Sequence, residues 1–287
     1  YLLFNDSLNG NMLSKVIDKK NGKVIDQFDL PFFDFNQSVG RFVTTDFSKL
    51  GSFRLGYGYK GQYYNNYFKK NNSIFIFDSS KKIGKELLNI SEADKLNKQY
   101  TKLNFDISYF NHLKFSPDGE ILIFLYVWVK NSKRYSTLGI FNFNTNKIHF
   151  INFNDWNPSH FNFYDKNNIV LTINNYKKSK LLFFNLKDEI KTYLSNSNIR
   201  HDFHPYFFRN KFILNDSYPN RLGYQKLNLL NIESNINSKI IEVFSPIKFR
   251  NINKCDLHPR MNNDHHLISV DTSYNNRRSV LILELKK

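Results

Sequence analysis

The feature that most constrains the fold is a repeat that begins with a histidine and recurs through the second half of the chain. The four repeats start at His112, His160, His204 and His258, between 44 and 54 residues apart. Each opens a run in which apolar and polar residues alternate, and a second pair of strand-like runs follows it. Four strands in a unit of roughly 40 to 50 residues are typical of the blades of a β-propeller. The repeat therefore predicts an all-β propeller.

The number of blades is estimated from the length of the chain. Division of 287 residues by a unit of roughly 41 predicts a seven-bladed β-propeller, with six to eight blades allowed, as a single domain over residues 1–287. The early units fit more loosely: they cover 2–28 and 40–82, and the Tyr-rich segment 57–68 is expected to be a long loop. The last strand, from Ser279, is expected to share a sheet with N-terminal strands, because closure removes exposed sheet edges.

The charge of the chain favours an anionic partner. Lys and Arg exceed Asp and Glu by 16, and such an excess attracts polyanions. The sequence shows no zinc-finger spacing, basic heptad helix or RNP-like strand, so nucleic acid is not the expected partner. A composition rich in Asn, Lys, Ile and Phe, as AT-rich genes encode, explains the excess equally well.

Other features leave the cellular setting open. Cys255 is the one cysteine, so no intrachain disulfide forms. No apolar run reaches the length of a membrane span. We expect a monomer that is secreted or periplasmic if a signal peptide was removed, and otherwise cytoplasmic.

The repeated histidines are candidates for chemistry. The first strand of each propeller blade lines the central channel, so residues that lead these strands converge at one rim. Histidine exchanges protons near neutral pH and is the commonest metal ligand. The alternative is that each histidine caps a turn by hydrogen bonding to backbone carbonyls.

Two pairs of residues predict a metal site. Asp202 and His204 form a D-x-H pair, and Cys255 and His258 form a C-x-x-H pair before the corresponding strand of the next unit. Together they offer oxygen, nitrogen, sulfur and nitrogen, a donor set that suits a closed, structural zinc site. The alternative is that Cys255 is a small buried apolar residue and His258 caps a turn.

Further side chains suit acid–base catalysis and the binding of an anionic sugar. Tyr218 lies three residues before Arg221, whose charge would favour the phenolate. The Arg221 guanidinium could also hold a carboxylate through two hydrogen bonds. The alternative is a Tyr-Pro turn beside a solvated arginine. The remaining candidates are His112 and His160 for catalysis and Tyr57, Tyr59 and Arg260 for substrate binding.

The segments 202–232 and 255–285 resemble the closing blades of the TolB-like propellers that include oligogalacturonate lyase and the propeller-type ulvan lyases. Shorter stretches at 53–59, 111–119 and 158–163 resemble further landmarks of that group. The resemblance implies a polysaccharide lyase that cleaves beside a uronic acid by β-elimination. A base removes the C5 proton, a positive group stabilises the enolate, and an acid protonates the leaving oxygen.

The resemblance also implies roles for individual residues. His112 and Tyr218 would exchange protons, and Arg221 would neutralise the carboxylate. The zinc ligands would be Asp202, His204, Cys255 and His258. The expected partner is an acidic polysaccharide. The main alternative is a non-catalytic propeller that binds glycans or acts as a scaffold in polysaccharide assembly, and a propeller that binds nucleic acid or protein is a third.

Overall fold

The computed structural model describes residues 1–59, 72–101, 105–194, 201–250 and 253–285, so residues 60–68 of the predicted loop lie outside it. Contacts between Cα atoms group the chain into two compact units, Tyr1–Phe153 (unit 1) and Asn154–Lys287 (unit 2). Each unit is described by itself, and the prediction of one domain stays a prediction.

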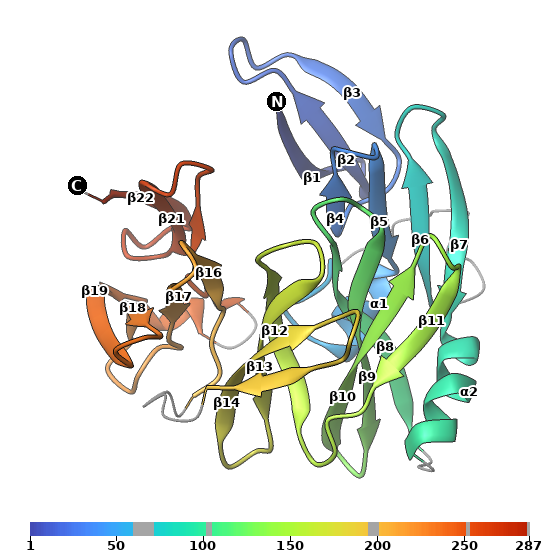
Figure 1. Cartoon of the computed structure of the whole chain (residues 1–287). Coiled ribbons are helices and arrows are strands. Elements are labelled where there is room, and N and C mark those ends of the chain that lie inside the picture. Colours follow the sequence, from blue (N-terminus) through green and yellow to red (C-terminus); the bar gives the residue numbers. More distant parts are fainter. Residues whose placement is uncertain (60–71, 102–104, 195–200, 251–252, 286–287) are drawn as a thin grey trace. The chain divides into compact units, whose positions relative to one another are not determined.

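Unit 1 contains three antiparallel sheets (Figure 1). The first has the order β1-β2-β3 (Leu2–Leu8, Asn11–Ile17, Val24–Phe28). The second has the order β4-β5-β6-β7 (Asp34–Asn36, Arg41–Thr45, Ser73–Asp78, Ile83–Asn89). The third has the order β11-β10-β9-β8 (Lys147–Ile151, Lys133–Asn142, Ile121–Lys130, Ile107–Phe115). Two helices accompany them, α1 (Phe47–Phe53) and α2 (Ile90–Thr101).

The core of unit 1 is built around the central strand β9. Its residues from Ile121 to Trp128 are all buried, as expected for a strand covered on both faces. Gly139 of β10 lies opposite Phe124, and a β-carbon there would come within 2.3 Å of the Phe124 ring. Glycine therefore leaves room for the aromatic ring. Helix α2 contacts β7, β8 and β11.

Unit 2 also contains three antiparallel sheets (Figure 1). The first has the order β12-β13-β14-β15 (Asn157–Phe163, Asn168–Asn174, Ser179–Asn185, Lys191–Tyr193). The second has the order β16-β17-β18-β19 (Tyr206–Phe208, Phe212–Asp216, Tyr224–Asn231, Ile236–Phe244). The third has the order β20-β21-β22 (Arg260–Met261, Leu267–Thr272, Ser279–Glu284), and the short helix η2 (Ile247–Phe249) precedes it.

The described residues thus form six sheets, and the fold is an all-β, six-bladed β-propeller. The prediction of seven blades was wrong. Division of the length assumed a uniform unit, but unit 1 spends 153 residues on three sheets because it also carries two helices and the connections around them. The predicted closure is wrong too: among the described residues β22 pairs with β21, and β1 pairs with β2.

The sheets of unit 2 place three of the four repeated histidines at comparable positions. His160 lies in β12, the first strand of its sheet. His204 and His258 each lie two residues before the first strand of theirs, β16 and β20. All three therefore come from the start of a sheet, as the repeat predicts. His112 lies in unit 1, within β8, where the pairing with β9 shifts register and φ is 50°.

A buried carboxyl group of unit 1 gives a prediction about stability. Burial raises the pKa of Asp34, although the charge of Lys114 and the backbone N–H of Phe115 partly oppose the shift. A group whose pKa is higher in the folded state destabilises the fold once the pH rises through that pKa. Asp34→Asn is therefore expected to raise the melting temperature at pH 7, each unit of pKa difference corresponding to about 1.4 kcal/mol.

The gain should shrink as the pH is lowered toward 3.8, the ordinary pKa of aspartate, because the parent carboxyl group is then neutral as well. Thermal unfolding of both proteins across this pH range measures the difference. Asp155→Asn, at an exposed position, is the control. A gain that is the same at every pH would contradict the role of the buried charge.

Candidate functional site

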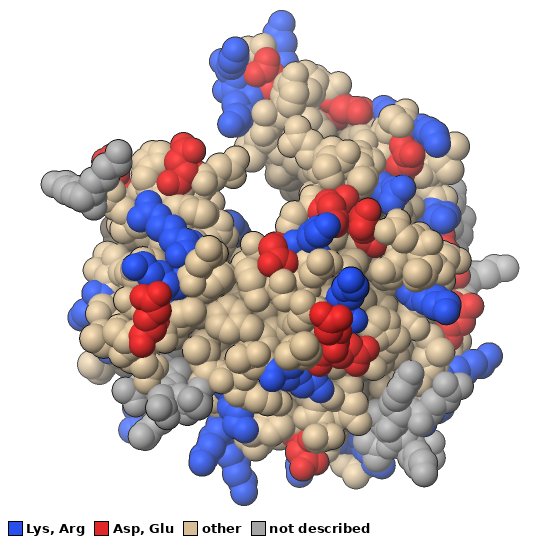
Figure 2. Space-filling view, in the orientation of Figure 1, with Lys and Arg blue, Asp and Glu red and all other residues tan. Residues whose placement is uncertain are grey.

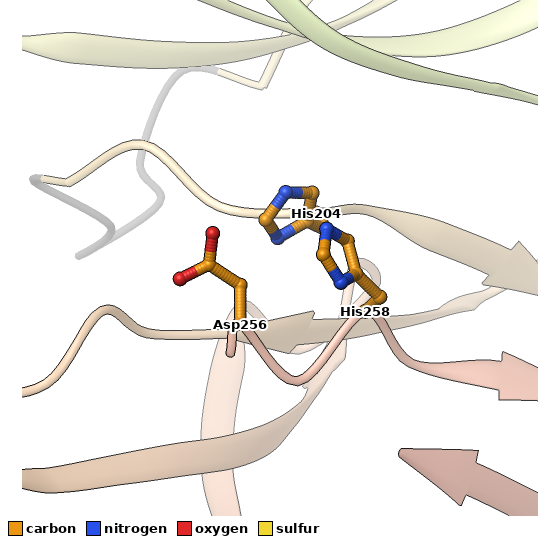
Figure 3. Close-up of side chains that lie close together, drawn as sticks. All are labelled: His204, Asp256 and His258. Atoms are coloured by element: carbon orange, nitrogen blue, oxygen red, sulfur yellow. The ribbon is translucent and has the colours of Figure 1, made fainter. Parts of the chain in front are cut away.

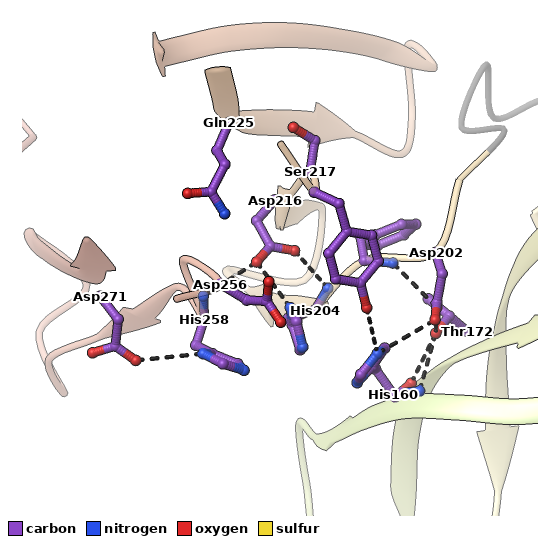
Figure 4. A network of polar contacts seen from close by, with 12 residues as sticks. His160, Thr172, Asp202, His204, Asp216, Ser217, Gln225, Asp256, His258 and Asp271 are labelled. Atoms are coloured by element: carbon purple, nitrogen blue, oxygen red, sulfur yellow. Dashed lines mark hydrogen bonds and ion pairs between the residues drawn. The ribbon is translucent and has the colours of Figure 1, made fainter. Parts of the chain in front are cut away.

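The centre of the candidate site is a stack of three imidazole rings in unit 2. The ring centroids of His160 and His204 lie 4.0 Å apart, and those of His204 and His258 lie 4.1 Å apart. Three successive sheets supply these residues (Figure 4). His258 has a φ of 41°, in the left-handed region that non-glycine residues seldom occupy. Such backbone strain persists only where the surroundings hold it, often at a functional site.

Two of the histidines turn their Nδ1 atoms toward carboxylates. His204 Nδ1 lies 2.8 Å from Asp216 Oδ2, and His258 Nδ1 lies 3.4 Å from Asp271 Oδ2. Asp216 also accepts hydrogen bonds from the backbone N–H groups of His204 and His258. The carboxylates therefore fix both rings and leave each Nε2 as the nitrogen that can bind a cation, the usual arrangement behind a metal-binding histidine.

The pKa values of this pair reflect their contact. Burial lowers the pKa of His204, but the negative charge of Asp216 outweighs it, so the net shift is upward. Burial raises the pKa of Asp216, but the His204 charge and hydrogen bonds outweigh it, so the net shift is downward. Asp216 is therefore ionised and suited to support a positive charge at His204, whether a proton or a metal ion.

His160 has a different environment. Its Nε2 lies 3.3 Å from Asp202 Oδ2 and 3.2 Å from the Tyr218 hydroxyl oxygen. Burial, with the neighbouring His204, lowers the pKa of His160, so the neutral ring is favoured. Burial opposes ionisation of Asp202, but hydrogen bonds from His160 and from the hydroxyl groups of Ser159 and Thr172 outweigh it and lower its pKa.

A candidate metal centre lies beside this group. One ligand atom each from His204, Asp256 and His258 lie within 4.8 Å of one another (Figure 3). Asp256 is only 5% exposed, and among the described residues its Oδ1 has no hydrogen-bond partner. A buried carboxylate oxygen without a donor is costly unless a cation or water meets it. Two imidazoles and a carboxylate suit zinc and manganese, so the residues fit a metal ion.

Tyr218 and Lys254 border the centre. Tyr218 lies in the connection after β17, is 37% exposed, and directs its hydroxyl group to His160 (Figure 4). The Lys254 ammonium lies 5.1 Å from the centre of the Tyr218 ring and 2.8 Å from Asp256 Oδ2. A phenol, a neutral imidazole, an ammonium and a candidate metal centre therefore share one part of unit 2.

The structure groups the predicted zinc ligands differently. His204 and His258 come together, but Asp256 joins them, whereas Asp202 pairs with His160. The buried thiol of Cys255 is absent from the trio, and burial raises its pKa. The trio is the metal site that this geometry offers, and zinc as the particular metal stays a prediction.

The other predicted residues have these positions. Arg221 is exposed in the turn between β17 and β18. Arg260 of β20 contacts Asp271, the carboxylate behind His258, at 3.5 Å. Tyr57 lies in unit 1 against Arg54, and Tyr59 accepts a hydrogen bond from Asn5. Their predicted roles, and that of His112, stay predictions.

Sequence reasoning missed Asp256, Lys254 and Asp216. The first was detectable, because Asp256 and His258 repeat the D-x-H spacing of Asp202 and His204. Lys254 continues the same alternation two residues earlier. Asp216 follows His204 by twelve residues, on the neighbouring strand, and only the pairing of β16 with β17 brings them together.

Basic residues do not gather in one place on the face that Figure 2 shows. Among the described residues of that face, Lys and Arg are interspersed with Asp and Glu. The positive net charge is thus spread over this face. The described helices include none with the length and apolar character needed to cross a membrane.

No protein-family model and no curated protein matches this sequence. Solved structures do. An oligogalacturonate lyase in complex with manganese is 9% identical, with a TM-score of 0.64 over 99% of this chain and 74% of that one. The oligogalacturonate lyase of Vibrio parahaemolyticus gives the same identity and TM-score, over 99% and 75%. TolB from Acinetobacter baumannii is 12% identical, with a TM-score of 0.57 over 98% of this chain and only 60% of that one. At these identities the similarity shows the fold alone, which is that of the TolB-like β-propellers.

Proposed function

We propose that this propeller is a lyase that cleaves an acidic, uronate-containing polysaccharide by β-elimination. The observation that carries the proposal is the approach of the Tyr218 hydroxyl to His160 Nε2 at 3.2 Å, in the same unit as the trio of His204, Asp256 and His258. β-Elimination needs a group that exchanges protons and a positive group beside the carboxylate, and the site offers both.

Tyr218 and His160 form the proton-exchanging part of this proposal. Neutral His160 can accept the phenolic proton, and the adjacent Asp202 carboxylate stabilises the imidazolium that forms. The phenolate that remains can take the C5 proton of a uronate, and the returning proton can pass to the leaving glycosidic oxygen. The exposure of Tyr218 gives a polymer access to its hydroxyl group.

The trio supplies the electrostatic part. A divalent ion held by His204, Asp256 and His258 would polarise the uronate carboxylate and stabilise the negative charge that builds on it. Lys254, beside Tyr218, adds a second positive charge. The manganese of the similar oligogalacturonate lyase supports a metal in this role, while zinc and manganese both suit the donors.

Absorbance near 235 nm tests the proposal, because β-elimination leaves an unsaturated uronate that absorbs there. The purified protein is incubated with a panel of uronate polymers, with added Mn²⁺ or Zn²⁺ and with EDTA. We expect product from at least one polymer, with less in EDTA. If a polymer binds and none yields product, the protein is a non-catalytic glycan-binding propeller. If none binds, both proposals fail.

A further inference from the structure

The Lys254 side chain contacts the candidate metal centre and the candidate acid–base group at once. Its ammonium forms an ion pair with Asp256 Oδ2 at 2.8 Å and lies over the Tyr218 ring at 5.1 Å (Figure 4 draws Asp256). The Asp256 side chain is 5% exposed, and that of Lys254 is 27% exposed. The carboxylate is therefore fixed in the interior, while the ammonium at the end of a flexible side chain can move.

We propose that Lys254 is an internal counter-ion of the trio, and that a divalent cation displaces its ammonium from Asp256. The inference rests on the proposed function only in taking His204, Asp256 and His258 as metal ligands. It adds a residue that competes with the metal and that responds when the metal binds.

The physical reason is competition for one carboxylate. A divalent ion bound by Asp256 would stand within a few ångströms of the ammonium, and like charges at that distance repel strongly where little water screens them. The metal gains two imidazole nitrogens that the ammonium cannot use, because it has only donors. The ammonium loses less by leaving, since its partly exposed side chain can rotate into water.

Displacement also gives Lys254 a second task. Once it leaves Asp256, its nearest described neighbour in the site is the face of Tyr218. There the free ammonium can bind the carboxylate of a uronate held next to the phenol. Metal binding would thereby prepare the site for an anionic sugar, and the two ligands would bind cooperatively.

Calorimetric titration with Mn²⁺, and separately with Zn²⁺, tests the inference. Lys254→Met and Lys254→Gln remove the competing charge, so both are expected to bind the metal about tenfold or more tightly than the parent. Lys254→Arg keeps the charge and should bind within about threefold of the parent. Lys239→Met, which breaks an exposed ion pair with Glu242 in the same unit, is the matched control and should leave the affinity unchanged.

Unchanged or weaker metal binding in both Lys254→Met and Lys254→Gln would overturn the inference, since Lys254 would then hold Asp256 in place for the metal. Absence of metal binding in parent and variants alike would overturn it too. The test is separate from that of the lyase: tighter metal binding without product from any polymer upholds the inference and refutes the lyase. Product formation with unchanged affinity does the reverse.

Discussion

Replacement of Tyr218 by phenylalanine is expected to slow product formation about 10²- to 10⁴-fold, the usual cost of removing a general acid or base. The substitution deletes one oxygen atom, which lies 3.2 Å from His160 Nε2. The ring and its contact with Lys254 remain, so the loss should fall on kcat. The measurement is the initial rate of absorbance increase near 235 nm, together with the affinity for the polymer.

Tyr224→Phe is the matched control. Tyr224 lies on β18 of the same unit, is 41% exposed against 37% for Tyr218, and packs on Phe244 away from the histidines. It should keep the parent rate. A rate for Tyr218→Phe within a few-fold of the parent would mean that the phenol takes no part in proton transfer, and the assignment of Tyr218 and His160 would be wrong.

Asp256→Asn is expected to weaken binding of Mn²⁺ about 100-fold or more. Substitution of residues that merely support metal ligands costs about 10- to 100-fold, and this change removes the one negative ligand of the trio. The amide has nearly the shape of the carboxylate, so packing is preserved. Calorimetric titration gives the dissociation constant directly.

Thermal unfolding provides a second measurement for the same variant. Free metal at 100 times its dissociation constant stabilises a protein by about 2.7 kcal/mol, so Mn²⁺ should raise the melting temperature of the parent and EDTA should reverse the gain. The variant should show neither change. Asp264→Asn, in an exposed turn of the same unit, is the control. Metal binding of parental strength in Asp256→Asn would show that the ion binds elsewhere.

The blade count shows which sequence evidence was informative. Two early units and four histidine-led units could be aligned, and the structure has six sheets. Division of the length gave seven because it treated every residue as part of a uniform repeat. Local alternation of apolar residues reports strands, whereas helices and connections such as α1 and α2 add length without adding a blade.

The metal ligands show a second difference. Cysteine and histidine are typical zinc ligands, which drew attention to Cys255 and His258. In an extended chain, however, residues two apart face the same side and residues three apart face opposite sides. Asp256 thus shares a side with His258 more readily than Cys255 does, and the structure places Asp256 in the trio.

The sequence by itself determined that the chain is all-β, that it is built from repeated four-strand units, and that histidines stand at the start of successive units. These properties follow from local alternation and spacing, which depend on near neighbours in the chain. Only the tertiary structure decided that Asp216 and Asp271 lie behind His204 and His258, and that Tyr218 faces His160. Strand pairing and loop conformation, including the left-handed backbone of His258, set these contacts, because they fix where a side chain points across distances that periodicity does not encode.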